Sequence, residues 1–444
     1  MLAGGLALRL ALVAGYHVAA VDGMQYYALS QELWKDGRLA YAPPPAPLAY
    51  SRLPGYPLLL AHVAVRGAVP AAVHVERATR WNAVFDVLTA LLAYLILREL
   101  GAPRGAGPLA LGLVLLAPLL IILASHALTE TPATFLATLE LYLAVRAMRD
   151  RPLLFAALCG AVAGFAQLVR ADAVTMAPAA LAALLLGGAP LARRLAATAV
   201  FAVVAAAVFA PWPLRNLSAF GQPYFAAWQW RNASTGRPLP TGPIEWARTF
   251  TTGARAEHSL DGAFAFELPL SLGQITPAMY DSPAERAELS ALFDRYNRER
   301  LSPAVDDSFR ALARARRARA PFRTYVTLPL RRLGAMFESG PSGELSMAGK
   351  LVGLVGRRPW VRTYDAAVYA LAALGALALA LTRARKALAI LSLTVVARCV
   401  LIPETVPLAI SQRFLCACFP ALLMLASVAV ATPIRLLTRL RQRL

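Results

Sequence analysis

Ten apolar stretches, each close to the length that crosses a lipid bilayer, dominate this chain. About 20 residues of α-helix span the hydrocarbon core of a membrane, and hydrophobic residues make up 58% of the 444 positions. That content is too high for one water-soluble core, so the sequence predicts an all-α polytopic membrane protein. The stretches cover residues 2–21, 80–98, 107–124, 131–147, 153–169, 171–188, 195–213, 364–382, 386–402 and 412–431.

Short basic loops between these stretches predict the orientation of the chain. Lys and Arg concentrate in the cytoplasmic loops of membrane proteins. If all ten stretches span, the basic loops fall on one side, at Arg98 and Arg104, Arg146 to Arg151, Arg193 and Arg194, Arg383 to Lys386, and Arg435 to Arg443. Both termini are therefore expected in the cytoplasm. The first stretch is expected to be a retained helix, because it lacks the basic segment of a cleaved signal peptide.

This alternation requires that residues 54–79 do not cross the membrane. A charge near the centre of a spanning helix costs about 2.5–3.5 kcal/mol. Several ionisable side chains would meet that cost here, so the segment is expected to form helices that lie on the outer surface. These residues are His62, Arg66, His74, Glu76 and Arg77.

Two outer regions are long enough to hold structure of their own. Residues 22–79 begin with a helical stretch that ends at Gly37 and is expected to lie on the membrane surface. Residues 214–362 are too long for a simple connection and predict an ordered loop with short amphipathic helices. The expected organisation is an N-terminal transmembrane module at 1–213, this loop at 214–362, and C-terminal helices with a basic tail at 363–444.

The net charge of +20 does not indicate nucleic-acid binding, because no nucleic-acid module is recognised in the chain. Anionic lipid is the expected partner of the basic loops. An arginine-rich helix at residues 310–323 is expected either to rest on lipid headgroups or to contact a phosphorylated substrate. The four cysteines lie in or beside apolar stretches, which predicts neither disulfides nor a thiolate metal site.

Charged residues at the outer ends of the apolar stretches form the candidate site. Asp22 follows the first stretch and Glu130 precedes the fourth, so both carboxylates are expected at the outer face. Transfer of a sugar from a lipid phosphate needs a base for the acceptor proton and cations for the departing phosphate. The candidate cations at the same face are Arg52 in the turn Arg52-Leu53-Pro54-Gly55-Tyr56-Pro57, Arg170, Arg215 and Arg413.

Each of these residues also has a purely structural explanation. Asp22 can be a solvated residue at the membrane boundary, and Glu130 can stabilise the first turn of its own helix. Arg170 and Asp172 can form a pair within a short turn. Arg215 and Arg413 can be cations that reach from the membrane edge to water.

The order of these motifs resembles the GT-C superfamily of polyprenyl-phosphate-sugar-dependent membrane glycosyltransferases. Within it, the chain is most similar to bacterial relatives of protein O-mannosyltransferases and of lipid A aminoarabinose transferases. The resemblance covers almost the whole chain and is carried by Asp22 with Tyr26 or Tyr27, Arg52 to Pro57, Thr129-Glu130, Gly164 to Arg170, Pro211-Trp212 with Arg215-Asn216, and Arg413-Phe414 with Pro420.

The resemblance implies a GT-C fold and a role for each candidate residue. Asp22 would be the general base or would position the acceptor, and Glu130 would be the acidic residue of the second outer loop. Guanidinium groups suit phosphate oxygens, so the arginines would bind the lipid phosphate of the donor. The substrate-binding residues implied in this way are Tyr26, Tyr27, Arg52, Tyr56, Arg170, Asp172, Arg215 and Arg413.

The resemblance also implies a reaction and a location. The donor would be a polyprenyl-phosphate sugar, the acceptor a protein, lipid or glycan, and the reaction a single displacement with inversion. The site would face the periplasm from a bacterial inner membrane. Gly23 follows Asp22, and Thr129 precedes Glu130, where the family has further acids. That departure disfavours a tightly held metal, and Mg²⁺ or Mn²⁺ bridging Asp22 and Glu130 stays an open alternative.

Two other classes of protein remain alternatives. A transporter or flippase of lipid-linked saccharides would also bind phosphate, but it would need ionisable groups near the middle of its spans. The ionisable groups of this chain are expected mostly at the outer ends. A non-catalytic membrane scaffold would leave the shared location of the acids and arginines without a reason.

Overall fold

The computed structural model describes residues 1–15, 17, 21–44, 46, 48–49, 52–223, 240–252, 260, 263–264, 268–338, 359–382, 384–405 and 412–441. Helices provide the regular structure of this part of the chain, apart from an isolated β-bridge between Ala40 and Leu48. The predicted all-α fold class is confirmed.

Helices occupy all ten of the predicted positions. Five are long and apolar enough to cross a membrane, and α5 with α6 makes a sixth if this pair, bent by 51°, is one span. The stretches Leu2–Gly15, Ala171–Leu185 and Phe419–Pro433 form shorter apolar helices. The elements are α1 (Leu2–Gly15), α4 (Ala71–Glu99), α5 (Ala106–Leu116), α6 (Pro118–Ala124), α7 (Glu130–Ala147), α8 (Pro152–Val169), η2 (Ala171–Met176), α9 (Ala177–Leu185), α10 (Leu191–Phe209), α18 (Pro359–Leu381), α19 (Arg385–Thr405), η7 (Gln412–Leu415) and α20 (Phe419–Arg441).

The start of α4 differs from the prediction. Residues 71–79 were expected among the surface helices of the first outer loop, but they form the first turns of α4. A helix of 29 residues is roughly 43 Å long, about 13 Å longer than the hydrocarbon core of a bilayer. The charges of this segment therefore need not enter the core of the membrane. Before them, α3 (Gly55–Leu59) and a π-helical turn η1 (Leu60–Ala64) form a separate short helix.

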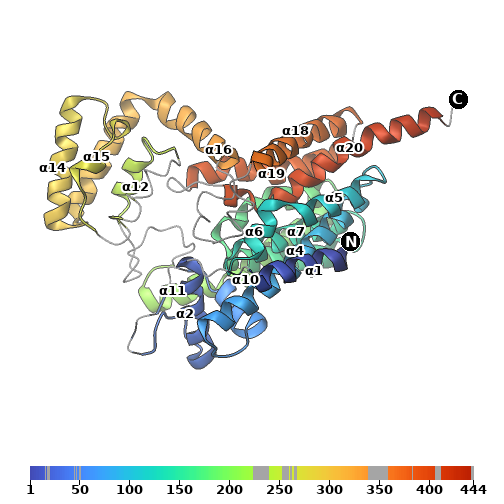
Figure 1. The fold of residues 1–444 in the computed structure, drawn as a ribbon, viewed down its shortest axis with the longest axis horizontal. Coiled ribbons are helices and arrows are strands. Elements are labelled where there is room, and N and C mark those ends of the chain that lie inside the picture. Colours follow the sequence, from blue (N-terminus) through green and yellow to red (C-terminus); the bar gives the residue numbers. More distant parts are fainter. Residues whose placement is uncertain are drawn as a thin grey trace.

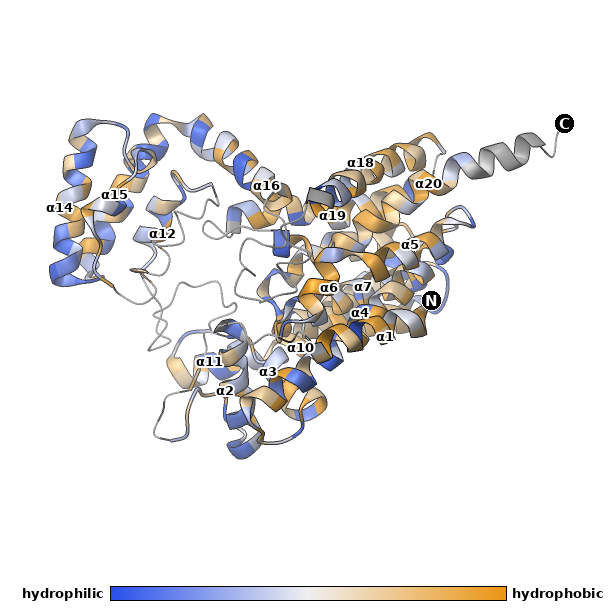
Figure 2. Cartoon of the chain, in the orientation of Figure 1, coloured by the Kyte–Doolittle hydropathy of each residue, from blue (hydrophilic) through white to orange (hydrophobic). Residues whose placement is uncertain are grey.

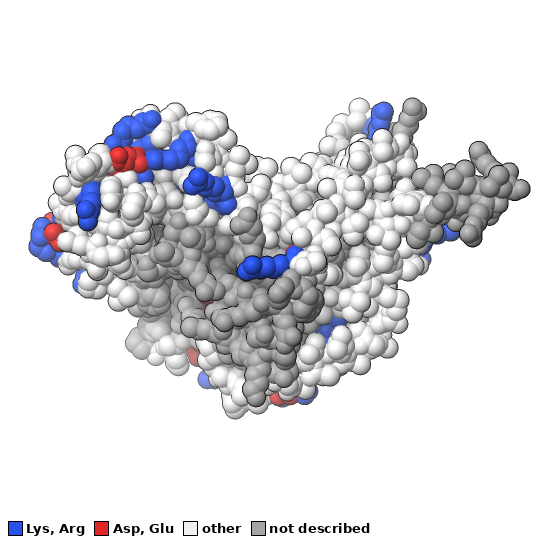
Figure 3. Space-filling view, turned by 45° about the horizontal axis from the view of Figure 1, so that its top comes forward, with Lys and Arg blue, Asp and Glu red and all other residues white. Residues whose placement is uncertain are grey.

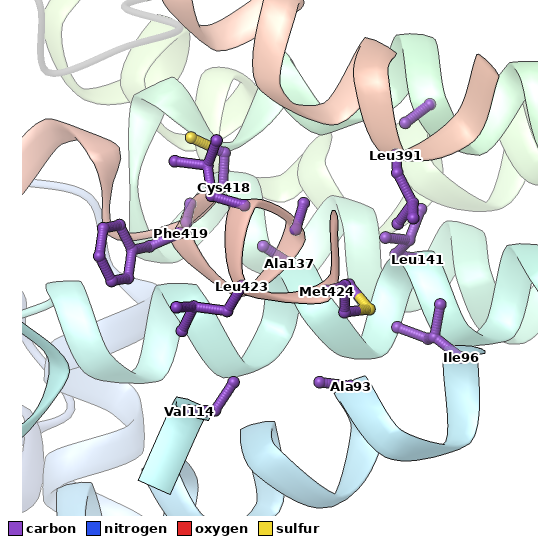
Figure 4. Close-up of a cluster of buried hydrophobic side chains, with 14 of the residues drawn as sticks. Ala93, Ile96, Val114, Ala137, Leu141, Leu391, Cys418, Phe419, Leu423 and Met424 are labelled. Atoms are coloured by element: carbon purple, nitrogen blue, oxygen red, sulfur yellow. The ribbon is translucent and has the colours of Figure 1, made fainter. Parts of the chain in front are cut away.

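The main hydrophobic core lies between helices that are distant in the sequence. Figure 4 shows side chains from α4, α5, α7, α19 and α20 directed toward one another. Ile96, Val114, Leu391 and Met424 are fully buried there, and Leu141 is almost so. This core joins the C-terminal helices to the N-terminal half of the bundle.

Small residues bring α8 and α10 into close contact. A Cβ atom at Gly160 would lie 2.4 Å from the carbonyl oxygen of Phe201, and one at Gly164 would lie 2.5 Å from that of Ala205. Helices in a bilayer associate through such close packing, because lipid tails are as apolar as the side chains. The two glycines thus hold the outer end of α8 in place.

Both termini lie at one end of the bundle (Figure 1). The opposite end carries α2 (Val21–Asp36), α11 (Pro211–Phe220), α12 (Gly242–Ala247), α14 (Pro283–Glu299) and α15 (Pro303–Arg319). Most residues of the bundle helices are hydrophobic, whereas hydrophilic residues are frequent on α2, α14 and α15 (Figure 2). The separation of the termini from the hydrophilic outer helices fits an even number of crossings.

The long outer loop forms a helical unit with its own core. Trp246 of α12 packs against Phe250, Phe293 and Phe309, and Trp246 is fully buried. Short helices were predicted in this loop and are present. The remaining elements are η4 (Leu272–Gln274), η5 (Pro277–Met279), η6 (Arg323–Thr327) and α16 (Leu328–Glu338).

Arginines of α15 and η6 stabilise this outer unit from within. Arg316 is fully buried and donates to Glu285 Oε1 at 3.0 Å and to Thr249 Oγ1 at 2.9 Å. Figure 3 shows blue and red side chains side by side on this part of the surface. Several of the cations expected to meet lipid or substrate therefore have protein partners. Further ion pairs of this unit include Arg310 with Asp306, Arg317 with Glu245, Arg319 with Glu285, and Arg323 with Asp281.

Candidate active site

A cavity of about 270 Å³ lies where the outer ends of α7 and α8 meet α2, η2 and η7. Three carboxylates and three guanidinium groups line it, so its charges are balanced. The lining residues are Asp22, Tyr26, Arg52, Leu53, Leu128, Thr129, Glu130, Val169, Arg170, Ala171, Asp172, Arg413 and Phe414.

Helix α2 and the turn after it supply one wall. Asp22 and Tyr26 are one helical turn apart and so share a face of α2. Arg52 forms an ion pair with Asp22, donates from Nε to Gln25 Oε1 at 2.9 Å, and lies 5.2 Å from the centre of the Tyr26 ring. The carboxylate of Asp22 is thus held at the cavity edge by a cation that is itself fixed on three sides.

The ionisation states of this wall follow from its surroundings. Burial lowers the pKa of Arg52, but the neighbouring Tyr26 and Asp22 raise it by more, so the pKa lies above its ordinary value. Burial raises the pKa of the Tyr26 phenol. Arg52 is therefore a permanent cation, and Tyr26 is a neutral hydrogen-bond donor at neutral pH.

Gly55 allows this wall to approach the next one. A Cβ atom at Gly55 would lie 2.7 Å from the carbonyl carbon of Leu168 and 2.8 Å from the nitrogen of Val169. Both contacts are with the backbone of the last turn of α8, which directly precedes Arg170. The absence of a side chain at Gly55 therefore sets the distance between the turn that carries Arg52 and the turn that carries Arg170.

Glu130 is the point on which two arginines converge. It is the first residue of α7, where the helix dipole favours a negative charge. Arg170 Nη1 lies 2.8 Å from Glu130 Oε1 and donates to Thr129 Oγ1 at 2.9 Å. Arg413 Nη1 approaches the same oxygen of Glu130 to 3.9 Å. The two arginines present one positively charged side of the cavity.

Asp172 holds Arg170 from the other side. Its Oδ1 accepts from Arg170 Nε at 3.0 Å, and its Oδ2 accepts from Arg170 Nη2 at 3.0 Å. Such a two-point contact between a carboxylate and a guanidinium group is geometrically specific. Oδ2 also accepts from Arg398 Nη2 at 2.7 Å. Both oxygens of Asp172 are therefore engaged by arginines of the protein.

Three of the predicted site residues do not line the cavity. Tyr27 donates to the carbonyl oxygen of Val69 at 3.0 Å. Arg215 donates to the carbonyl oxygen of Ala49 at 2.7 Å and lies over the ring of Trp212. Tyr56 is buried with its ring edge against Tyr26, at 5.0 Å between centroids. The structure brings together Asp22, Tyr26, Arg52, Glu130, Arg170, Asp172 and Arg413.

Reasoning from the sequence missed buried charges within the spans. Arg398 of α19 is fully buried beside Asp172, and Arg9 of α1 forms a buried ion pair with Asp86 of α4. Glu140 of α7 is also buried. The expectation that ionisable groups lie mostly at the outer ends was too simple. The signal was in the sequence, because an ionisable residue inside an apolar stretch is costly and marks a specific partner.

The side chains do not fit a resident Mg²⁺ or Mn²⁺ ion. No group of three or more His, Cys, Asp and Glu side chains that could hold a metal occurs among the described residues. Asp22 and Glu130, the proposed ligands, are each ion-paired with an arginine. Hard cations need several oxygen ligands, and guanidinium groups repel a second positive charge at the same place. The cavity therefore relies on arginine for positive charge.

Comparison with known proteins supports this description of the fold. Residues 73–214 match the family model described as dolichyl-phosphate-mannose-protein mannosyltransferase. No curated protein matches the chain.

Several solved structures match this chain, and those of an archaeal oligosaccharyltransferase are similar in fold. The Archaeoglobus fulgidus oligosaccharyltransferase AglB, in complex with an inhibitory peptide and a dolichol-phosphate, is 13% identical with a TM-score of 0.52, over 100% of this chain and 52% of AglB. Its apo form is 13% identical with a TM-score of 0.52, over 99% and 51%. ArnT from Cupriavidus metallidurans, bound to undecaprenyl phosphate, is 15% identical with a TM-score of 0.43, over 97% and 77%.

The present chain spans about half the length of the oligosaccharyltransferase. The fold expected from the order of the outer motifs is therefore similar to that of a solved membrane glycosyltransferase, AglB. This chain therefore has a fold similar to that of the oligosaccharyltransferase AglB, and its segment from α4 to α11 matches the family model of the dolichyl-phosphate-mannose-protein mannosyltransferases.

Proposed function

We propose that this protein is a membrane glycosyltransferase that moves a sugar from a polyprenyl-phosphate donor to an acceptor at the periplasmic face. The observation that carries the proposal is the cavity itself, in which Asp22 and the pair Arg170 and Arg413 line the same space. A carboxylate and two cations are the groups that this transfer requires. AglB, which shares the fold, was solved with a dolichol-phosphate.

The arginines act on the donor. Arg170 and Arg413 bind the phosphate oxygens and stabilise the negative charge that grows as the bond between the anomeric carbon and the phosphate oxygen breaks. Glu130 and Asp172 hold these guanidinium groups before the donor arrives. The cations therefore need little rearrangement when the phosphate leaves.

Asp22 acts on the acceptor. Its carboxylate takes the proton from the attacking hydroxyl or amine, while the acceptor oxygen or nitrogen forms the new bond to the anomeric carbon. The polyprenyl phosphate leaves with the electrons of the broken bond. This single displacement inverts the configuration at the anomeric carbon, and the ion pair with Arg52 holds Asp22 in place.

The position of the cavity suits a lipid-linked donor. The cavity lies at the end of the bundle away from both termini, where the spanning helices meet the outer helices. The polyprenyl chain lies between spans, and its sugar reaches the space under the two outer loops. The acceptor is a protein, a lipid or a glycan, and the host membrane is a bacterial inner membrane.

Substitution of Asp22 tests this function directly. Asp22→Asn removes the base and is expected to lower turnover about 100-fold to 10,000-fold, whereas Asp36→Asn, at the exposed end of the same helix, is expected to have no effect. Release of polyprenyl phosphate from synthetic polyprenyl-phosphate sugars is measured with purified protein in detergent and membrane extract as the acceptor source.

The same assay separates the alternatives. A detergent solution has no sealed compartments, so a transporter or flippase would not consume the donor. Absence of turnover by the wild type would favour a transporter of lipid-linked saccharides, and equal turnover by Asp22→Asn would exclude Asp22 as the base.

A further inference from the structure

A buried arginine of α19 joins the two turns that present the cavity arginines. Arg398 has no exposed surface, and its guanidinium group makes contacts on three sides. Nη2 donates to Asp172 Oδ2 at 2.7 Å, Nη1 donates to Thr175 Oγ1 at 3.0 Å, and Nε donates to the carbonyl oxygen of Phe414. Asp172 and Thr175 belong to η2, whereas Phe414 belongs to η7.

Each of these turns is adjacent to one cavity arginine. Arg170 directly precedes η2 and is gripped at two points by Asp172. Arg413 directly precedes Phe414 in η7. Arg398 itself is not among the residues that line the cavity. It therefore touches the supports of both arginines and does not touch the space where the donor would bind.

We propose that Arg398 is a positioning residue, which acts through Asp172 and the backbone of Phe414 to hold Arg170 and Arg413 at the spacing that binds one phosphate group. This inference rests on the proposed function, because it assigns the phosphate of the donor to these two arginines. It also changes the role of Asp172 from substrate contact to support, since both of its oxygens already accept hydrogen bonds from arginines.

The cost of a buried charge supports this assignment. An arginine within a spanning helix is expensive, and Arg398 lies seven residues before the end of α19 at Thr405, roughly 10 Å along the helix. An arginine that only marked the edge of the membrane would extend its side chain from this position to water. Arg398 is instead turned entirely toward η2 and η7, and it donates hydrogen bonds to both of these short turns.

The first test is a double-mutant cycle read by binding of undecaprenyl phosphate to the purified full chain in detergent. Arg398→Met and Arg170→Gln are each expected to weaken binding on the order of 10-fold to 100-fold. Because Arg398 acts in part through Arg170, Arg398→Met should weaken binding less in the Arg170→Gln background than in the wild type. Independent, additive losses in the cycle would overturn the proposal.

Two further variants separate positioning from general stability. Arg9→Met removes the arginine of another buried ion pair, that with Asp86, which does not line the cavity. It is expected to lower thermal stability but to leave binding by the folded protein unchanged. Arg398→Lys keeps a cation beside Asp172 but cannot make all three contacts, so partial recovery of binding is expected. Equal weakening of binding by Arg9→Met would overturn the positioning role.

Turnover measured on the same variants distinguishes the two proposals. Wild-type protein that binds undecaprenyl phosphate but releases none from a lipid-linked sugar would contradict the proposed glycosyltransferase, while the binding cycle would still decide the role of Arg398. Wild-type protein that does not bind the lipid phosphate would contradict both.

Discussion

Arginine and carboxylate side chains form pairs around the cavity, and these pairs determine which charged groups the cavity presents to a ligand. Asp22 pairs with Arg52, and Glu130 pairs with Arg170. Each carboxylate thereby has an arginine as its counter-ion, and each arginine is kept in a defined orientation. A phosphate group that entered would meet Arg170 together with Arg413, whose Nη1 lies 3.9 Å from Glu130 Oε1.

This pairing predicts that activity does not depend on a divalent metal. Turnover of a polyprenyl-phosphate sugar by the wild type should be unchanged after treatment with EDTA, because guanidinium groups supply the positive charge at the phosphate. A metal-dependent glycosyltransferase assayed in parallel serves as the control for removal of metal. Activity that EDTA abolishes and Mn²⁺ or Mg²⁺ restores would contradict this description of the cavity.

The turn from Arg52 to Pro57 shows how short elements position the site. Its prolines make it stiff, and Gly55 lets it rest against the backbone at the end of α8. Stiffness and close approach together place Arg52 on one side of the cavity and Arg170 on the other. Neither property alone would fix the width of the cavity.

Addition of one methyl group to this contact should therefore reduce activity. In Gly55→Ala the new Cβ would meet backbone atoms of Leu168 and Val169 at 2.7–2.8 Å, so one of the two walls must shift. A displacement of about 1 Å in a catalytic site can cost about 100-fold in rate. Turnover and thermal unfolding are compared with those of Gly4→Ala, whose new Cβ would have no neighbour within 4 Å. Wild-type turnover by Gly55→Ala would show that the contact is not critical.

The outer unit of α12, α14 and α15 should lose stability in acid. A hydrogen bond from Arg323 holds the pKa of Asp281 below its ordinary value, and Arg316 and Arg319 act in the same direction. A carboxyl group whose pKa is lower in the folded state than in the unfolded state stabilises the fold at neutral pH. This stabilisation is lost as the pH falls below about 4 and passes through the pKa of the folded state.

The measurement is denaturant unfolding of the full chain between pH 7 and pH 3, followed by the fluorescence of its tryptophans, including the buried Trp246. Asp281→Asn should lower stability at pH 7 and reduce the dependence on pH. Asp294→Asn, at an exposed position of α14, is the matched control. An unchanged pH profile in Asp281→Asn would contradict the role of this ion pair.

The two ends of the molecule differ in structure. Both termini lie at one end of the bundle, and the cavity and the outer helices lie at the other (Figure 1). A lipid-linked donor could approach the cavity from within the membrane, while a polar acceptor could approach from the side of the outer helices. The proposed reaction therefore suits a site that lies where spanning and outer helices meet.

Labelling of introduced cysteines tests this orientation. Ala291→Cys lies at an exposed position of α14, and Gly188→Cys lies at an exposed position between α9 and α10. A membrane-impermeant maleimide should label the first variant in intact spheroplasts, and the second only after the membrane is opened. The unsubstituted protein is the control for background labelling, since Cys159, Cys416 and Cys418 are buried but Cys399 is only half-buried. The reverse pattern of labelling would place the cavity in the cytoplasm.

Much of the architecture could be predicted from local sequence patterns. Runs of apolar residues predicted ten spans, because a segment in lipid must satisfy its backbone hydrogen bonds internally. Helices lie at these positions, and among the described residues five of them, or six with the bent pair, are long and apolar enough to cross a membrane. Boundaries were less certain where a helix is longer than the membrane is thick. Helix α4 begins at Ala71, before the apolar stretch does. A hydropathy pattern does not show where a helix begins outside the apolar stretch.

The candidate site was predicted in part for the same reason. The ends of the spans are visible in the sequence, so charged residues such as Asp22, Glu130 and Arg170 could be assigned to one face of the membrane. That face also holds Tyr27 and Arg215, which turn toward backbone carbonyls away from the cavity. The position of a residue along the chain decides at which membrane face it lies. The direction of its side chain depends instead on its neighbours in space.

The sequence by itself determined the helical membrane architecture, the shared side of the charged residues and the resemblance to the GT-C superfamily, since all three depend on the order and spacing of residues. Only the tertiary structure decided which charges pair. Arg398 is 226 residues from Asp172, and Arg9 is 77 residues from Asp86. Such partners are chosen by helix packing, because in a medium of low polarity a buried charge is tolerated only where the fold brings its counterpart within reach.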